Sequence, residues 1–384
     1  MAERIDRLLA LGADGRHPAG AVVGLRSAAG TEVRAGGWAA LPTASTDGVP
    51  MTPTTWLDWA SVTKVAVTTV LVLRLVDRGD LALADPATRY LPGFAVPGAD
   101  RVRVADLLTH TAGLPPWWPL YAETTDRDGA LARAQALPLQ AAPGTAHRYS
   151  DLGPLLAGLV VERVTGLGLA AALHDLVTEP LGLALRFGPV APDLAATTAD
   201  SDVVEQTMVA TGRPYPVPPD AGSFTGWRDG PVRGEVHDGN TAHALGGVAG
   251  HAGAFGPVAD LLTLGTALCD GALVRPELLD IAARPTPAAP DQALGFRRSV
   301  RSGPGGRPVT WLWHGGFPGA FWAVEPRSGT VVAGGATRLH GTVGPLATGA
   351  HPADPLHGVA TGDEIAGVVL DAATTAPTAE GALP

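Results

Sequence analysis

The chain has 384 residues and a net charge of −10, with 27 Lys and Arg against 37 Asp and Glu. This acidic balance, with no basic run, disfavours a nucleic-acid-binding protein, which needs positive charge against phosphates. A hydrophobic fraction of 46% is enough to bury a core, and the single cysteine excludes an internal disulfide and a cysteine-based metal cluster. The N-terminus lacks the pattern of a signal peptide, and the longest strongly apolar stretch, 65–73, is too short for a membrane span, so we expect a cytoplasmic protein.

Hydrophobic periodicity predicts the elements in chain order. Residues 2–11 predict a first helix, and 20–27 with 32–39 predict a strand hairpin. Three further stretches predict helices, of which the first is almost wholly aliphatic: 61–77, 152–165 and 258–269. The stretch 200–255 is rich in Gly and Pro and predicts mostly loop. The last third predicts three strands and a closing helix: 309–313, 320–324, 330–334 and 363–373.

Strands at both ends with helices between them predict one fold class. We expect an α/β (α+β) protein in which an antiparallel sheet, built from both termini, is flanked by helices and carries a mostly helical insertion. The expected division is a single domain over 1–375, with the α/β part at about 1–78 and 255–375, the helical part at about 79–254, and a flexible tail at 376–384.

Lys64 is the only lysine among the 27 basic residues. A lysine in such an arginine-rich chain indicates a position where arginine cannot substitute, because a buried lysine can lose its proton and an arginine cannot. Ser61 lies three residues earlier, and i, i+3 spacing places both side chains on one helical face. The pair therefore predicts a serine nucleophile beside its base, against the alternative of a chance Ser and a surface Lys.

Several segments in order carry a resemblance to a known family. They are 59–64 (WASVTK), 107–115 (LLTHTAGLP), 148–153 (RYSDLG), 236–240 with 245–253 (VHDGN, LGGVAGHAG) and 314–316 (HGG). The chain resembles the class C β-lactamase-like serine hydrolases, which include penicillin-binding proteins, D-alanyl-D-alanine carboxypeptidases and esterases. The resemblance implies the β-lactamase/transpeptidase fold.

The resemblance also implies catalytic roles. Ser61 would attack the acyl carbon and form an acyl-enzyme, while Lys64 and Tyr149 would share the base work, in a division that the sequence leaves open. The oxyanion hole would consist of the backbone N–H groups of Ser61 and Phe317.

The chain departs from the stricter family motifs at three positions. Asp151 stands where Asn is usual; its carboxylate could pair with Lys64 and hold it charged, which favours Tyr149 as the neutralising partner or the base. His314 and Gly315, followed by Gly316, stand where Lys-Thr-Gly or His-Thr-Gly is usual, so substrate-carboxylate binding is weakened and efficient β-lactam hydrolysis is not expected. His314 remains a candidate electrostatic or hydrogen-bonding group at the site, or a simple strand-end residue.

Four more residues are candidate substrate contacts. Trp117 and Trp118 follow the His110 turn and predict an apolar wall at the cleft entrance, or else part of the core. His237 and Asp238 either line the cleft or have a structural role. Their spacing with the neighbouring histidines matches no compact zinc site, so no metal is expected.

We therefore expect a serine hydrolase that cleaves small-molecule esters, activated amides or peptides without a cofactor and without nucleic-acid or membrane partners. One alternative is an acyltransferase or peptide-cyclising enzyme of secondary metabolism, in which an amine or hydroxyl replaces water. Another is a D-amino-acid-specific peptidase or carboxypeptidase, or a weak β-lactamase. A penicillin sensor is disfavoured, because sensors usually carry a membrane anchor. The sequence does not predict the oligomeric state.

Overall fold

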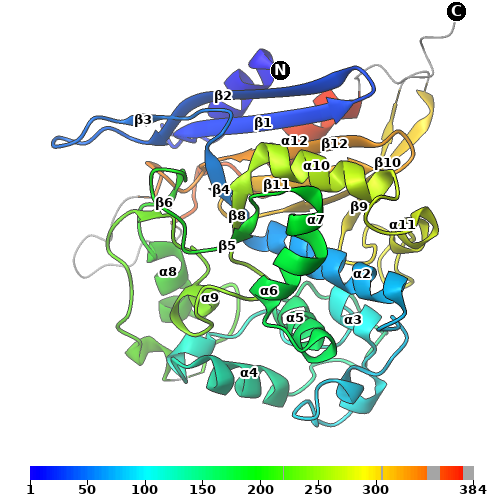
Figure 1. The fold of residues 1–384 in the computed structure, drawn as a ribbon. Coiled ribbons are helices and arrows are strands. Elements are labelled where there is room, and N and C mark those ends of the chain that lie inside the picture. Colours follow the sequence, from blue (N-terminus) through cyan, green and yellow to red (C-terminus); the bar gives the residue numbers. More distant parts are fainter. Residues whose placement is uncertain (219, 304–305, 344–354, 375–384) are drawn as a thin grey trace, which may run out of the picture.

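A seven-stranded antiparallel sheet organises the chain, which the computed structural model describes over 1–218, 220–303, 306–343 and 355–374 (Figure 1). The strand order is β3-β2-β1-β12-β11-β10-β9, so β1 pairs with β12 and the two ends of the chain meet in the sheet centre. The strands are β1 Gly20–Ser27, β2 Gly30–Ala40, β3 Val49–Pro50, β9 Arg297–Ser302, β10 Pro308–Gly315, β11 Ala320–Glu325 and β12 Thr330–Ala336. The predicted fold class, with a sheet built from both termini, is confirmed.

Apolar side chains on the central strands alternate between the two faces of this sheet, so both faces are buried. In β11, Phe321 packs into one apolar cluster while Trp322 packs into the other. Helices α1 (Ala2–Leu9) and α12 (Gly362–Thr374) cover the first face, and α10 (Val258–Cys269) covers the second.

The helical part lies on the α10 side of the sheet and fills the lower half of Figure 1. Its helices are α2 Val70–Arg78, α3 Val104–Leu108, α4 Arg127–Ala136, α5 Leu152–Thr165, α6 Leu169–Leu173, α7 Glu179–Leu181, α8 Val203–Thr211 and α9 Gly239–His243, and α11 Pro276–Ala282 lies beside α10. Short strands connect it to the sheet: β4 Trp56–Asp58, β8 Ala254–Pro257 and β5 Arg186–Phe187 form one group, and β6 Thr197–Ala199 with β7 Val232–Arg233 form a second.

Most predicted elements are confirmed, one helix prediction is corrected and one strand was missed. The stretch 200–255 is mostly loop, as predicted, and short elements interrupt it: α8, a 3₁₀ turn (Ala221–Ser223), β7, α9 and the start of β8. The predicted helix 61–77 is a 3₁₀ turn (Ala60–Val62), a π-helical segment (Lys64–Thr69) and then α2. Strand β9 was not predicted, since five of its six side chains are polar and hide the alternation. The predicted tail, 376–384, lies outside the described residues.

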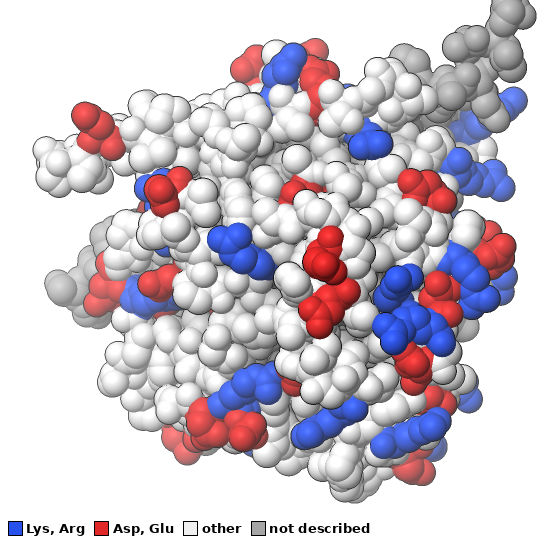
Figure 2. Space-filling model, in the orientation of Figure 1, with Lys and Arg blue, Asp and Glu red and all other residues white. Residues whose placement is uncertain are grey.

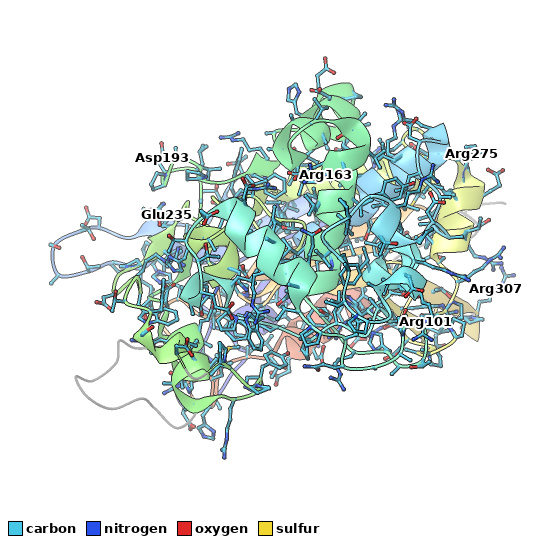
Figure 3. All side chains as sticks on the ribbon, turned by 90° about the horizontal axis from the view of Figure 1, so that it is seen from below. Arg101, Arg163, Asp193, Glu235, Arg275 and Arg307 are labelled. Carbon is cyan, nitrogen blue, oxygen red and sulfur yellow. The ribbon has the colours of Figure 1, made fainter. Side chains whose placement is uncertain are left out.

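The surface shown in Figure 2 carries interspersed positive and negative side chains without a large patch of one sign. Seen from below in Figure 3, the labelled charged residues lie around the outside of the molecule: Arg101, Arg163, Asp193, Glu235, Arg275 and Arg307. In the described part of the chain no single helix is both long and apolar enough to cross a membrane; α5 with the stretch Leu169–Leu181 reaches that length only as a pair bent by 77°.

Helix α10 approaches the sheet closely because glycines, one on the helix and one on a strand, lie at the contact. A Cβ built on Gly265 of α10 would lie 2.5 Å from a side-chain carbon of Val331, and one on Gly24 of β1 would lie 2.6 Å from Val258. These contacts hold α10 against the central strands β1 and β12.

Replacing Gly265 by Ala should lower the free energy of unfolding by about 1–3 kcal/mol, because the added methyl overpacks this contact. The matched control is Gly367→Ala in α12, where an added Cβ meets nothing within 4 Å; this change should stabilise the protein by about 0.4–1 kcal/mol. Denaturant unfolding of both variants measures the difference, and equal stability of Gly265→Ala and wild type would contradict the close packing.

Candidate active site

The predicted nucleophile lies on a strained turn between β4 and the buried helix. Ala60, just before Ser61, has a positive φ of 45°, a conformation that costs a non-glycine residue about 1–3 kcal/mol and is typical of functional sites. Ser61 is the second residue of the helical segment, in the first turn, where backbone N–H groups lack intrahelical partners. Its Oγ lies 2.8 Å from Lys64 Nζ, so the predicted i, i+3 contact forms although the segment is not a regular α-helix.

Lys64 is buried, with 1% of its side chain exposed, and its Nζ contacts three oxygens besides the Tyr149 hydroxyl. Besides Ser61 Oγ these are Asp151 Oδ1 at 2.7 Å and the carbonyl oxygen of His251 at 3.0 Å. Three acceptors match the three N–H donors of an ammonium group. The resting Lys64 is therefore charged and paired with Asp151, as the replacement of Asn by Asp had indicated.

Opposing effects set the ionisation of this group. Burial alone would lower the pKa of Lys64, but the neighbouring Asp151 carboxylate and the Tyr149 oxygen outweigh it, and the net pKa is raised. Burial also raises the pKa of Tyr149 against the lowering effect of Lys64, so Tyr149 is a neutral phenol at pH 7. Its hydroxyl interacts with both Ser61 and Lys64.

His110 positions Tyr149 beside Ser61 and Lys64. His110 Nδ1 accepts the N–H of Ser150 at 3.2 Å, its carbonyl accepts the N–H of Arg148 at 2.9 Å, and its ring lies 4.7 Å from the Tyr149 ring. Burial lowers the pKa of His110 well below its usual value, so the ring is neutral and can accept this hydrogen bond. His110 is thus a structural residue of the site.

The end of β10 brings His314 to the opposite side of Tyr149, with ring centroids 5.9 Å apart. Burial and the nearby Lys64 charge lower the pKa of His314 to about 3, so it is neutral. Its Nδ1 lies 2.8 Å from the carbonyl oxygen of Gly315 and donates to it, which leaves Nε2 as an acceptor without a partner among the described residues. This tautomer offers no positive charge to a substrate carboxylate.

Gly316 lets the end of β10 approach the nucleophile turn. A Cβ on Gly316 would lie 2.8 Å from the carbonyl oxygen of Trp59 and 3.3 Å from the Cβ of Ala60. Phe317 follows, and its N–H makes no hydrogen bond with any described residue. Arg338 Nε donates to the Phe317 carbonyl at 2.6 Å, and the guanidinium lies 4.8 Å from the Phe317 ring.

A cavity of about 1120 Å³ opens over these groups. Ten sequence-predicted residues line it: Ser61, Trp117, Tyr149, Asp151, His237, Asp238, His314, Gly315, Gly316 and Phe317. Lys64 lies buried against Ser61. Trp118 does not line the cavity: its indole N–H donates to Glu123 at 2.7 Å and its ring packs against Arg133, so it belongs to the α4 surface.

The cavity also contains residues that sequence reasoning missed. Helix α8 supplies Glu205, and the following loop supplies Tyr215, whose ring lies 6.3 Å from that of Trp117. Burial and the neighbouring Asp238 raise the pKa of Glu205 well above its usual value. The only available signal was the apolar spacing of α8, which the surrounding Gly and Pro obscured.

The histidines near Asp238 form separate pairs. Asp238 accepts from His251 Nε2 at 3.0 Å, whereas His243 contacts Asp202 at 3.3 Å. Within the described ranges no three His, Cys, Asp or Glu side chains come together as a metal site. His237 is neutral, because burial lowers its pKa to about 4, and its ring stacks on Phe317 with an interplanar angle of 14°.

Comparison with known proteins identifies the family. The Beta-lactamase family model matches residues 5–351, so the chain belongs to this family. It is 28% identical over 307 residues to a Bacillus subtilis protein named "N-acetylmuramyl-L-alanine amidase", covering 71% of this chain and 65% of that one. It is 30% identical over 244 residues to an Escherichia coli protein named "Putative D-alanyl-D-alanine carboxypeptidase", covering 58% and 52%.

A solved structure agrees with this assignment. The penicillin-binding protein homologue from Caulobacter crescentus superposes with a TM-score of 0.63 at 25% identity, over 88% of this chain and 90% of that one. The chain thus spans nearly all of this structural relative, but only about half to two thirds of the two curated relatives. The predicted family is confirmed.

Replacing Lys64 by Arg should lower kcat/KM about 10²–10⁴-fold, because a guanidinium keeps the charge but cannot exchange a proton with Ser61. Steady-state kinetics on an aryl ester measures the loss, and circular dichroism verifies folding. Arg74→Lys, the opposite exchange in α2 and outside the cavity, is the control and should leave kcat/KM within about 3-fold of wild type. High activity in Lys64→Arg would show that this amine transfers no proton.

Proposed function

We propose that the protein is a serine hydrolase that cleaves carboxylic esters or activated amides through an acyl-enzyme on Ser61. The observation that carries this proposal is the set of contacts around Lys64 Nζ, which joins Ser61 Oγ to the Asp151 carboxylate beneath a cavity. A hydroxyl in contact with a group that can exchange protons is the requirement for an activated serine.

Acylation begins with two proton transfers along this network. Lys64 gives one proton to Asp151 across the 2.7 Å contact, and its freed lone pair accepts the proton of Ser61. Ser61 Oγ then bonds to the acyl carbon, and the carbonyl oxygen gains the negative charge. The N–H groups of Ser61 and Phe317 donate to this oxygen, and each such donor typically contributes about 10²–10³ in rate.

Collapse of the intermediate restores the charges. The bond to the leaving group breaks, and the Tyr149 hydroxyl donates its proton to the departing oxygen or nitrogen. Lys64 returns a proton to Tyr149 and regains one from Asp151, so the starting ion pair is restored. Water, activated through the same groups in reverse, then releases the acid and frees Ser61.

At the end of β10 the electrostatics favour a neutral acyl group, whereas the positive side chains of the cavity lining are Arg213, Arg297 and Arg338. Lys64 is balanced by Asp151, and His314 and His237 are neutral near the reacting centre. Without a positive charge at the Lys-Thr-Gly position, a substrate carboxylate gains little there, which supports esters over β-lactams. A cavity of about 1120 Å³ exceeds the usual size for a small ligand, about 300–1,000 Å³, and leaves room for a bulky acyl group.

A second candidate is cleavage of an amide bond in an amino-acid or peptide substrate. The names of the two curated relatives, an amidase and a carboxypeptidase, favour it at 28–30% identity. The same acyl-enzyme would serve this reaction, and transfer to an amine or hydroxyl acceptor in place of water would make it an acyltransferase.

Pre-steady-state hydrolysis of 4-nitrophenyl acetate by wild type and Ser61→Ala tests the proposal, with a chromogenic cephalosporin in parallel. We expect a burst of 4-nitrophenol in wild type, because acylation releases it before water attacks, and no burst in Ser61→Ala. Added amine acceptors and D- and L-alanine amides then separate hydrolase, acyltransferase and amidase. An absent ester reaction together with a stable cephalosporin adduct would overturn the esterase assignment.

Restoring the usual motif with Gly315→Thr and His314→Lys should raise the rate of cephalosporin acylation about 10–100-fold, the effect of one charge-assisted hydrogen bond. The site has space for the new threonine, because a Cβ on Gly315 approaches no described atom beyond its chain neighbours closer than 3.8 Å. Stopped-flow absorbance measures acylation, and Gly315→Thr alone separates the hydroxyl from the charge. An unchanged rate would show that carboxylate binding does not limit the reaction.

A further inference from the structure

Asp58 lies directly before the strained nucleophile turn and is 5% exposed. It is the last residue of β4, two positions before Ala60. Its Oδ1 accepts the N–H of Ala60 at 2.8 Å, and its Oδ2 accepts the N–H of His237 at 2.9 Å. One carboxylate therefore joins the turn that carries Ser61 to a segment 179 residues away.

His237 extends this connection to the second oxyanion donor. Its ring stacks on the Phe317 ring, with centroids 6.2 Å apart. The N–H of Phe317, two residues after β10, has no partner among the described residues, and the other donor is the N–H of Ser61, which follows Ala60. The two donors lie on segments far apart in sequence, and the contacts through Asp58 and His237 connect them.

We propose that Asp58 is a positioning residue for the oxyanion hole: its carboxylate stabilises the positive-φ turn at Ala60 and fixes the Ser61 N–H relative to the Phe317 N–H. This inference rests on the proposed function. A strained backbone conformation persists only where surrounding contacts determine it, and the hydrogen bond from Ala60 to Asp58 is such a contact. Asp58 does not line the main cavity, so it acts through its neighbours and not on the substrate.

The ionisation of Asp58 supplies a readout that a purely structural residue lacks. Burial raises the pKa of Asp58 to about 6, against the two backbone hydrogen bonds; nearby Asp238 raises it further and Arg228 lowers it. The backbone N–H of His237 donates to Asp58, and the imidazole of His237 is neutral in this pH range. Above this pKa both carboxylate oxygens accept; below it, one oxygen carries a proton and one N–H loses its acceptor.

The reactivity of Ser61 should therefore fall as the pH falls through about 6. A fluorophosphonate probe measures this reactivity without knowledge of the natural substrate, because Ser61 Oγ displaces fluoride from phosphorus and the serine proton leaves with it. We would measure the second-order labelling rate from pH 5 to 8 in wild type, Ser61→Ala, Asp58→Asn and Asp260→Asn. Asp260 is the matched control: it accepts the Leu185 N–H at 2.6 Å and lies outside the cavity.

Asp58→Asn should label about 10–100-fold more slowly at pH 8, because an amide accepts only one of the two N–H groups and misplacement of reacting groups has effects of this size. It should also lack the wild-type decrease in labelling rate near pH 6. In ester hydrolysis, the substitution should lower kcat more than it changes KM. Asp260→Asn should keep the wild-type rate and pH profile.

Two failures are distinguishable. If wild type is unlabelled, or Ser61→Ala is labelled equally, the proposed function is wrong. If wild type is labelled at Ser61 but Asp58→Asn matches it in rate and pH profile, only the role of Asp58 is wrong. Should Asp58→Asn not fold, the wild-type profile decides: a labelling rate that stays constant between pH 5 and 7 overturns the inference, and a decrease near pH 6 supports it.

Discussion

The buried ammonium group of Lys64 is the constraint on which the rest of the site depends. A charge removed from water is strongly destabilising unless it is paired and hydrogen-bonded. Lys64 satisfies this condition with oxygens from three separate segments: its own helical turn, the start of α5 and the loop before β8. These three segments must therefore meet around Nζ, and their meeting places Ser61 and Asp151 in the lining of the cavity.

The sequence indicated this centre because lysine is unique in the chain and arginine cannot replace its proton chemistry. Spacing alone placed Ser61 beside Lys64, and the contact forms although 3₁₀ and π segments replace the expected α-helix. Tyr149 and His314 came from motifs of the resembled family, and both reach the cavity. The positions of these residues could be predicted because each rests on short-range spacing or on a motif.

Asp58, Glu205 and Arg338 could not be found in that way. Each is an ordinary charged residue in the sequence, and each gains its place in the site through a partner far along the chain. The partner of Asp58 is a backbone N–H 179 residues away, and that of Arg338 is the Phe317 carbonyl, 21 residues away. Backbone groups leave no signature in side-chain patterns, so only the tertiary structure reveals such contacts. Trp118 is the opposite case: it follows Trp117 in the sequence, but its side chain lies outside the cavity.

The two glycines at the end of β10 differ in their surroundings: packing requires a glycine at position 316 but not at position 315. Gly316 has no space for a side chain, because the carbonyl oxygen of Trp59 lies 2.8 Å from the position of a Cβ. Gly315 has space, since an added Cβ there would meet only the Ala320 carbonyl oxygen, at 3.8 Å. Packing therefore explains Gly316 but not Gly315. Under the proposed function, the hydroxyl missing at a position that can hold one, beside a histidine that burial keeps neutral, would change substrate recognition without a change of fold.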